Sequence, residues 1–282
     1  MERLKIAIVT WSGHHWALKR MNNLAAFHSR LGHRIFYKTF SDADLANQLK
    51  DFDLVYVWNG SYPKVRKELV EPLYKNGTRI VFVELGWFPQ AEYVYFDQSG
   101  TNAYSELISS SLDWLDEADF AELDRTAKAY RGSRTITEGG YVFVPLQLPH
   151  DTQVALFSPY KWMGEFVRHV RWVFRGKRII FRRHPKDPKT YADLNLGKDG
   201  EGDLMDLICN ADLVYGLNST VLLEAALLGK QVTAIGASFL NMGPSRRHAL
   251  AALVARQVHW RETDFLPWTR PGRGMEHLLE FL

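Results

Sequence analysis

The sequence lacks several features that would assign a protein to a well-defined class. Its 282 residues include one cysteine, Cys209, so an intrachain disulfide and a multi-cysteine metal site are both excluded. Cys209 lies in an apolar, helix-like pattern and is expected to be a buried structural thiol. No apolar run approaches the roughly 20 residues that a membrane-spanning helix needs. The first residues lack the basic, apolar and small-residue order of a secretory signal, so a cytoplasmic location is expected.

Neither the composition nor the charge indicates disorder or nucleic-acid binding. Apolar residues make up 46% and charged residues 24% of the chain, which is typical of a folded domain. The net charge of +3 is too small to indicate a nucleic acid partner, and no nucleic-acid motif is present. Lysine and arginine instead cluster locally, in RGKRIIFRRHPK and SRRH. This pattern favours a basic cleft for an anionic ligand.

Strand-like and helix-like patterns alternate through both halves of the chain. Buried-strand patterns occur at residues 4–10, 34–40, 53–58 and 79–84, and again at 141–146, 177–183, 212–216 and 231–236. Such alternation predicts βαβ units and parallel sheets. No GxGxxG follows the first strand, so an ordinary dinucleotide site is disfavoured. Residues 85–102 are irregular and aromatic and are expected to form a functional or mobile loop.

The predicted fold class is therefore α/β, with two Rossmann-like, doubly wound domains. The best candidate linker is RGSRTITEGG, residues 131–140, because it combines glycine and polar residues between two periodic segments. We expect an N-terminal domain over 1–135 and a C-terminal domain over 136–282. The tail of the second domain ends in a short amphipathic helix that can pack back on the N-terminal domain.

The stretch YVFVPLQLPHDTQV, residues 141–154, is the strongest candidate for chemistry. It begins as a buried strand and ends in a loop that places Asp151 just past that strand. Ligands of open α/β sheets bind at the carboxyl ends of the strands, which makes Asp151 a candidate reacting group. Aspartate is also a common residue at a turn or at the start of a helix. Both interpretations stay open on this stretch alone.

A second candidate segment, KRIIFRRHPKDP, contains a strand that stops at His184. His184 is flanked by Arg182, Arg183 and Lys186, so the end of this strand can donate hydrogen bonds to an anionic oxygen. The alternative is that His-Pro only terminates the strand.

A third segment, DLVYGLNSTVLLEAALLGK, passes from a strand into a helix that begins near Ser219 and Thr220. Unpaired backbone N–H groups and hydroxyls at such a helix start form an anion site, although serine and threonine are also the usual N-caps. The second and third segments together favour a nucleotide phosphate at the ends of neighbouring strands.

The first half supplies one further carboxylate of interest. Glu84 ends a buried-strand pattern, where a carboxylate is costly unless it is paired or functional. If two sheets face each other across a cleft, Glu84 and Asp151 can converge, as a retaining double displacement requires. The alternative for Glu84 is an ordinary salt bridge at a strand end. Asp97 is a weaker candidate and is expected to form an Asx turn. Two histidines, His14 and His15, follow the first strand without an assignable role.

Four motifs occur in the order seen in the capsule polysaccharide biosynthesis family: VELGWFPQ with DQSGTN, then YVFVPLQLPHDTQV, then RRHPKDP, then GLNSTVLLEAALLGKQVTAIG. They cover residues 80–236, and the chain most resembles the family's retaining β-Kdo transferases, which act in capsule linker and O-antigen (lipopolysaccharide) assembly. The first 80 residues match only in their alternation. The resemblance implies a GT-B fold, with the nucleotide-sugar donor on the C-terminal domain and the acceptor on the N-terminal domain.

The resemblance also implies a chemistry and its residues. The donor would be CMP-Kdo, the acceptor a saccharide or glycolipid, and transfer would proceed through an adduct on Asp151, with Glu84 as acid/base. The CMP phosphate or Kdo carboxylate would be held by donor-binding residues of the matching motifs: Arg182, His184, Lys186, Ser219 and Thr220. Glu224 would reach the ribose, unless it is a helix-surface glutamate. No metal or other cofactor is implied.

Family enzymes often lie within larger polysaccharide-assembly polypeptides, and the nine tryptophans leave peripheral contact with the inner membrane open. Two alternatives to the CMP-Kdo transferase remain on the sequence. One is a GT-B transferase or epimerase that uses a UDP-sugar, and the other is a non-catalytic glycan- or nucleotide-binding module.

Overall fold

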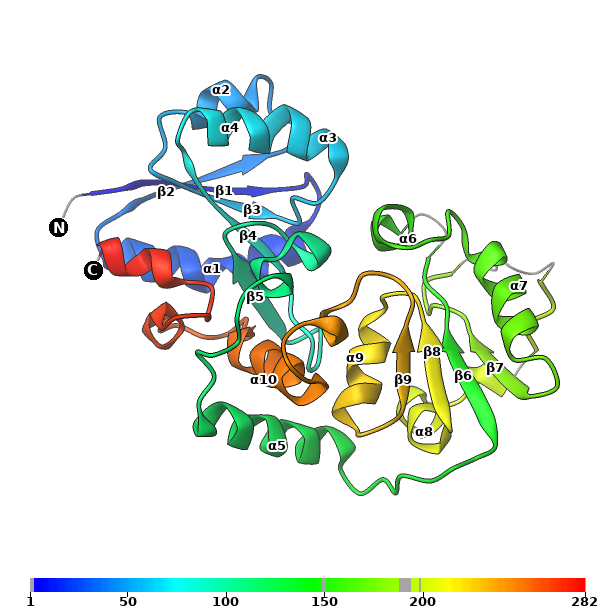
Figure 1. Cartoon of the computed structure of the whole chain (residues 1–282). Helices are drawn as coiled ribbons and strands as arrows, with labels where there is room; N and C mark the ends of the chain where they lie inside the picture. The colour runs from blue at the N-terminus through cyan, green and yellow to red at the C-terminus, as the bar shows by residue number, and fades with distance from the viewer. Residues whose placement is uncertain (1–2, 149–150, 188–193, 198, 282) are drawn as a thin grey trace. The chain divides into compact units, whose positions relative to one another are not determined.

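The computed structural model describes residues 3–148, 151–187, 194–197 and 199–281. The chain divides into two compact units, which we describe separately (Figure 1). Unit 1 consists of Met1–Asp116 and Ala252–Leu282, and unit 2 consists of Glu117–Ala251. Within the described part of the chain, no helix has both the length and the apolar character needed to cross a membrane.

Unit 1 is built on a six-stranded sheet with the order β10-β5-β4-β3-β1-β2. Its strands are β1 (Lys5–Thr10), β2 (Arg34–Thr39), β3 (Leu54–Trp58), β4 (Arg79–Leu85), β5 (Tyr93–Asp97) and β10 (Val258–His259). The first four strands are parallel, as their apolar, β-branched composition predicts. The last two add an antiparallel edge, since β5 pairs with β4 and β10 pairs with β5.

This edge corrects the expectation that residues 85–102 form one irregular loop. The expected loop contains β5, whose residues Tyr93–Asp97 pair with β4. Its YVYFD sequence is rich in aromatic residues that favour strands once a partner strand is present. The remaining loop is therefore much shorter than the sequence suggested.

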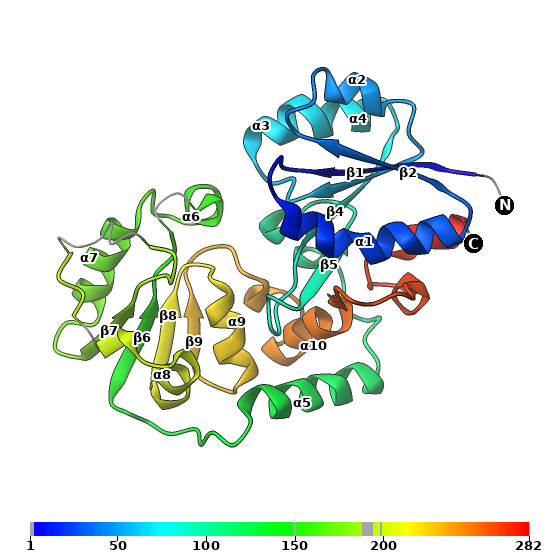
Figure 2. The same cartoon turned by 180° about the vertical axis from the view of Figure 1, so that it is seen from behind.

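Helices cover both faces of the unit 1 sheet. They are α1 (His15–Arg30), α2 (Leu45–Leu49), α3 (Pro63–Val65), a π-helical turn (Arg66–Val70) and α4 (Glu71–Lys75), with short 3-10 turns at Asn102–Tyr104, Glu106–Ile108, Leu266–Thr269 and Glu276–Phe281. Figures 1 and 2 show α1 and the C-terminal segment on one face and α2 to α4 on the other.

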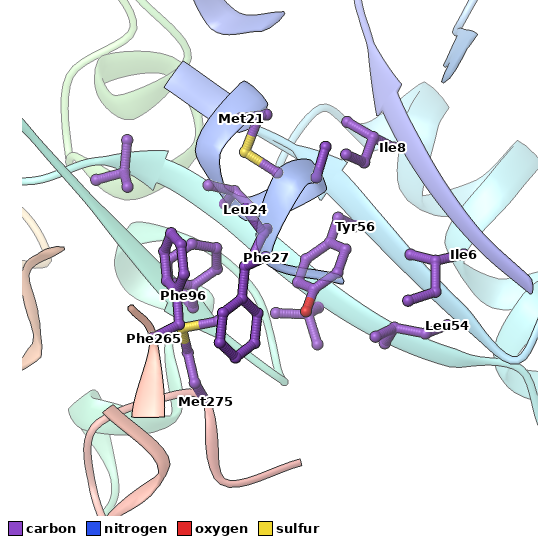
Figure 3. Close-up of a cluster of buried hydrophobic side chains, with 14 of the residues drawn as sticks. Ile6, Ile8, Met21, Leu24, Phe27, Leu54, Tyr56, Phe96, Phe265 and Met275 are labelled. Carbon is purple, nitrogen blue, oxygen red and sulfur yellow. The ribbon is translucent and has the colours of Figure 1, made fainter. Parts of the chain in front are cut away.

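The face under α1 holds the larger core cluster of unit 1. Met21, Leu24 and Phe27 of α1 lie there against alternate residues of the strands, such as Ile6 and Ile8. Figure 3 shows that Phe265 and Met275 of the C-terminal segment, whose ribbon is pale red, enter the same cluster. The spacing of three and four residues in α1 produces this buried stripe.

Unit 2 is built on a four-stranded, fully parallel sheet with the order β7-β6-β8-β9. Its strands are β6 (Tyr141–Pro145), β7 (Arg178–Arg182), β8 (Leu213–Gly216) and β9 (Val232–Ala234). Its helices are α5 (Glu117–Arg131), α6 (Thr152–Phe157), α7 (Met163–Val173), α8 (Leu204–Asn210) and α9 (Thr220–Leu227), with 3-10 turns at Asp199–Glu201 and Phe239–Asn241. Helix α10 (Arg246–Arg256) begins in unit 2 and ends in unit 1. The prediction of an α/β protein with parallel strands in both sheets is confirmed, and the sheets are consistent with the Rossmann-like expectation.

The compact units begin and end at other positions than the predicted domains. Helix α5, expected at the end of the first domain, belongs to unit 2. Arg247 forms a 2.8 Å ion pair with Asp124 of α5, and the Phe120 ring lies 5.1 Å from the ring of His248. The boundary therefore falls at residues 116/117 instead of 135/136, because residues more than 100 positions away hold α5.

The tail from Ala252 belongs to unit 1. Its main anchor is Arg256, which is 1% exposed and donates to the Phe96 carbonyl at 2.8 Å and to the Asp97 carboxylate at 3.2 Å.

Cys209 of unit 2 is 1% exposed, and burial raises the pKa of its thiol, so the prediction of a buried structural cysteine is confirmed.

Candidate functional site

Asp151 lies in the turn between β6 and α6. It is the N-cap of α6, and its Oδ1 accepts a hydrogen bond from the Gln153 backbone N–H at 2.8 Å. The helix-start interpretation of Asp151 is thus confirmed, whereas its predicted reactivity stays a prediction. The Asp151 carboxylate can accept further hydrogen bonds besides this capping bond, because each of its two oxygens can accept more than one. Residues 149 and 150 of the same loop lie outside the described residues.

The second oxygen of Asp151 is held by a buried glutamine. Gln147 Nε2 donates to Asp151 Oδ2 and to Asn218 Oδ1, both at 3.1 Å. Asn218 in turn donates to the Gln153 carbonyl at 2.9 Å. Gln147 follows β6 and Asn218 follows β8, so this network joins the carboxyl ends of two neighbouring strands. It fixes the orientation of the Asp151 carboxylate.

The start of α9 lies directly beside this network in sequence. Ser219 is the N-cap of α9 and accepts a hydrogen bond from the Val221 backbone N–H at 3.3 Å. Thr220 is the first residue of the helix. The capping alternative is confirmed for Ser219. The helix start also places partial positive charge next to Asn218, so phosphate binding by Ser219 and Thr220 remains a prediction.

His184 follows the end of β7, the other neighbour of β6. Its Nδ1 accepts a hydrogen bond from the Lys186 backbone N–H at 3.1 Å. Burial and the Lys186 ammonium lower the pKa of His184, while the Asp151 and Asp187 carboxylates oppose this change. A neutral ring with an accepting Nδ1 carries its proton on Nε2. His184 therefore presents one hydrogen-bond donor, and the Asp151 charge acts on it.

A cavity of about 260 Å³ opens at the end of β7. It is lined by Phe181, Arg182, Arg183, His184, Pro185, Gly197, Gly200 and Glu201. Position 200 requires glycine because the Phe181 carbonyl group lies so close that a β-carbon at position 200 would overlap it. Arg182, which the sequence predicts to bind the nucleotide sugar, donates hydrogen bonds to the Gly200 carbonyl at 2.9 Å and to the Gly202 carbonyl at 2.5 Å. Its guanidinium thus shapes one wall of the cavity.

Glu224 is not on the helix surface. It is 9% exposed on α9, and the Tyr130 hydroxyl of α5 donates to it at 2.5 Å. Burial raises the pKa of Glu224 to about 7, and the Tyr130 hydrogen bond opposes this change only in part. The helix-surface alternative is therefore wrong, and the partner that the structure describes for this carboxyl group is a tyrosine.

The two candidate carboxylates of unit 1, Glu84 and Asp97, accept different hydrogen bonds. Glu84 is half-buried, is the second-last residue of β4 and pairs across the sheet with Tyr95. Its Oε1 accepts a hydrogen bond from the Leu85 backbone N–H at 2.8 Å. The convergence of Glu84 with Asp151 across a cleft stays a prediction. Asp97 accepts from the Ser99 backbone N–H at 2.9 Å, which confirms the predicted Asx turn.

Sequence reasoning missed Gln147 and Asn218 as members of the site. A signal was present, since each is a polar amide two residues after a buried strand of the same sheet. Their role in the network depends on the pairing of β6 with β8, because this pairing brings two residues 71 positions apart within hydrogen-bonding distance.

No family model matches the chain. Protein FixF of Sinorhizobium fredii (strain NBRC 101917 / NGR234) is 33% identical to it in an alignment of 220 residues that covers 70% of this chain and 53% of FixF. The chain thus spans about half the length of this curated relative.

Two solved structures share the fold. The Thermosulfurimonas dismutans KpsC beta Kdo 2,7 transferase matches with a TM-score of 0.65, 18% identity and 98% coverage of each chain. The beta Kdo 2,4 transferase of the same KpsC matches with a TM-score of 0.62 and 16% identity, over 89% of this chain and 90% of the other. The resemblance to β-Kdo transferases that the motifs indicated is therefore confirmed at the level of the fold.

Proposed function

We propose that this protein is a retaining β-Kdo glycosyltransferase that transfers Kdo from CMP-Kdo to a saccharide or glycolipid acceptor. The fold that it shares with two KpsC transferase structures supports this proposal. The observation that carries it is the setting of Asp151. Its carboxylate is held at a strand end by Gln147, and its charge acts on His184.

In the proposed double displacement, an Asp151 carboxylate oxygen attacks the anomeric carbon of Kdo and forms an ester-type adduct. The bond from that carbon to the CMP phosphate oxygen breaks, and CMP leaves with the bonding electron pair. An acceptor hydroxyl then attacks the adduct while Glu84 takes its proton. Asp151 leaves as a carboxylate, and two inversions give net retention.

The donor would be bound by the carboxyl edge of unit 2. The Nε2–H of His184 would donate a hydrogen bond to the leaving phosphate or to the Kdo carboxylate. The ammonium of Lys186 would neutralise its charge, together with the helix start at Ser219 and Thr220. Under this proposal neither a metal ion nor another cofactor is needed. Arg182 would contribute by shaping the cavity wall, and Glu224 by joining α9 to α5.

The remaining assignments follow from the same proposal. Units 1 and 2 would act as the acceptor and donor domains of a GT-B enzyme in capsule or O-antigen assembly. The enzyme would work in the cytoplasm, either in peripheral contact with the inner membrane or within a larger assembly polypeptide.

The test is to incubate the protein with CMP-Kdo without acceptor and to look for a covalent Kdo adduct by intact-mass spectrometry. The key variant is Asp151→Asn, because asparagine also caps helices and keeps α6 intact. The matched control is Asp203→Asn, which changes the N-cap aspartate of α8 in the same unit. We expect the adduct on the wild type and on Asp203→Asn, and none on Asp151→Asn.

An Asp151→Asn protein that still transfers Kdo at the wild-type rate would remove Asp151 from the mechanism. Thermal unfolding with added nucleotides separates the alternatives, because only a true ligand stabilises the fold. CMP and CMP-Kdo should raise the midpoint, whereas stabilisation by UDP alone would favour a UDP-sugar enzyme. CMP-Kdo binding without turnover, unchanged by Glu84→Gln, would indicate a non-catalytic module.

A further inference from the structure

Unit 1 has a cavity of its own, of about 280 Å³, that the proposed catalytic residues do not line. Its lining includes Trp11, Phe40, Asp42, Asp44, Lys64 and Glu68, together with four aliphatic residues. Trp11 and Phe40 directly follow β1 and β2. The cavity thus lies at the carboxyl edge of the parallel strands, where open α/β sheets bind ligands. Its volume is close to the lower end of the usual range for ligand pockets, about 300–1,000 Å³.

One wall of this cavity is aromatic. The Trp11 ring lies 4.5 Å from the Phe40 ring and 5.5 Å from the Tyr62 ring, and the Trp11–Tyr62 contact is edge-on. Trp11 is half-buried and packs against the apolar cluster under α2 to α4, so its position is fixed while part of it stays accessible. A fixed indole face suits the apolar face of a sugar ring.

The polar part of the lining is mainly acidic. Asp42, Asp44 and Glu68 contribute three carboxylates, and Lys64 contributes one ammonium group. Hydrogen bonds from Thr39 lower the pKa of Asp42, so this carboxylate is ionised at neutral pH. The excess of negative charge disfavours a phosphate or a carboxylate in this cavity. It favours a neutral or positively charged ligand whose hydroxyl or ammonium groups donate hydrogen bonds.

The cavity and Glu84 lie on the same face of the unit 1 sheet. Along β4, Ile80 and Phe82 belong to the cluster under α2 to α4, and the alternation of a strand puts Glu84 on that face as well. Trp11 packs against the same cluster. In the strand order, β4 and β1 are separated by β3, which corresponds to about 10 Å across the sheet.

We infer that this cavity binds a non-acidic saccharide unit, stacked on Trp11, and that it prefers an amino sugar. Under the proposed glycosyl transfer, on which this assignment rests, the bound unit belongs to the acceptor. Because the separation from Glu84 exceeds a hydrogen-bonding distance, the unit in the cavity is a neighbour of the sugar that carries the reacting hydroxyl. The acceptor is therefore longer than one sugar.

The test measures the binding of glucosamine, glucose and glucuronate to the full chain by ligand-observed saturation-transfer NMR. These probes share one ring and differ in charge. We expect glucosamine to bind more tightly than glucose and glucuronate to bind least. Trp11→Ala should weaken the binding of glucosamine and glucose about tenfold. The control is Trp16→Ala, because Trp16 is 42% exposed and contacts Trp58 of the opposite face.

A second variant keeps the test decisive if Trp11→Ala does not fold. Glu68 has a side chain that is 63% exposed, so Glu68→Gln should fold normally. It should narrow the preference for glucosamine over glucose by about two- to fivefold, and an unchanged preference would overturn the assignment to an amino sugar. Equal binding by the wild type and Trp11→Ala, or tightest binding of glucuronate, would overturn the inference.

The same proteins separate this inference from the proposed function. Stabilisation by CMP-Kdo reports on unit 2 and should survive Trp11→Ala. Trp11-dependent saccharide binding without any response to CMP-Kdo would keep the cavity assignment and reject the transferase. A Kdo adduct without Trp11-dependent saccharide binding would keep the transferase and reject the cavity assignment.

Discussion

Gln147 Nε2 lies 3.1 Å from Oδ2 of Asp151, and the same nitrogen lies 3.1 Å from Oδ1 of Asn218. Gln147 is 5% exposed, so these contacts are shielded from water. A buried amide that donates to a carboxylate holds that carboxylate in one orientation and stabilises its charge. Gln147 is thus a positioning residue for the proposed nucleophile.

Gln147→Met tests this relationship because methionine has a similar length and cannot donate a hydrogen bond. Without this donor the Asp151 carboxylate loses its fixed orientation, and a misplaced catalytic group can cost about 100-fold in rate, so kcat for Kdo transfer should fall about 10- to 100-fold. The KM for CMP-Kdo should change little, since Gln147 is not proposed to contact the donor. Initial rates at varied CMP-Kdo concentration measure both. A rise in KM at unchanged kcat would indicate a donor contact instead.

The sequence predicts the strands of this fold better than their partners. The periodic segments 4–10 and 141–146 became β1 and β6 because buried parallel strands are continuous apolar runs. Asp151 and His184 could be placed at strand ends for the same reason. In contrast, β5 was missed, since a short aromatic segment becomes a strand only when β4 lies beside it.

The rest of the candidate site depends on pairs that lie far apart in sequence. Tyr130 and Glu224 are 94 positions apart, and no local pattern distinguishes a buried glutamate on an apolar helix from an exposed one. Arg256 and Asp97 are 159 positions apart. Such pairs follow from the packing of whole elements, which periodicity does not contain.

The buried ion pair of Arg256 and Asp97 provides a stability prediction. Their side chains are 1% and 0% exposed, and Glu106 also contacts the Arg256 guanidinium. Arg256→Met would leave Asp97 buried without its cation, which should lower the free energy of unfolding by about 3–5 kcal/mol. Urea unfolding measures this change, and limited proteolysis should cut the tail from Ala252 faster.

Two comparisons control for this prediction. Arg247→Met breaks an ion pair whose side chains are 54% and 61% exposed, so it should cost no more than about 1 kcal/mol. Asp97→Asn combined with Arg256→Met should recover part of the loss, because the uncompensated charge is then absent. A single Arg256→Met variant as stable as the wild type would show that the pair does not anchor the tail.

Glu224 predicts a decrease in stability as the pH rises. Burial raises its pKa from 4.5 to about 7, so between these pH values the folded state keeps a proton that the unfolded state has lost. Stability therefore falls across this window, by on the order of 3 kcal/mol, and is constant above it. Glu224→Gln has no such proton and should be more stable than the wild type at about pH 8. Thermal unfolding of both proteins from about pH 5 to about pH 8 measures the difference. The exposed Glu122 provides the control variant Glu122→Gln, and parallel profiles for all three proteins would contradict the assignment.

The histidines around Tyr56 predict the opposite dependence. The Tyr56 hydroxyl lies 2.8 Å from His28 Nε2 and 3.1 Å from His277 Nε2. Burial lowers the pKa of both histidines to about 3, assisted by the charges of His33 and His277 on His28 and of Arg79 on His277. The unfolded chain binds these two protons below its ordinary histidine pKa of 6.5, whereas the folded chain does not. Stability is therefore lost as the pH falls from 6.5 towards 3, with a slope of up to about 2.7 kcal/mol per pH unit.

His277→Gln should reduce this slope by about 1.4 kcal/mol per pH unit, the contribution of one proton. Glutamine can still form a hydrogen bond with Tyr56, so the loss of packing is limited. Chemical unfolding at several pH values between about 4 and about 6.5 measures the slope. The control is His15→Gln, because His15 is exposed at the start of α1. Since His277 lies in the C-terminal segment and Tyr56 in β3, a reduced slope would also show that acid acts on the attachment of this segment to the sheet. An unchanged slope in His277→Gln would instead assign the acid sensitivity of unit 1 to other groups.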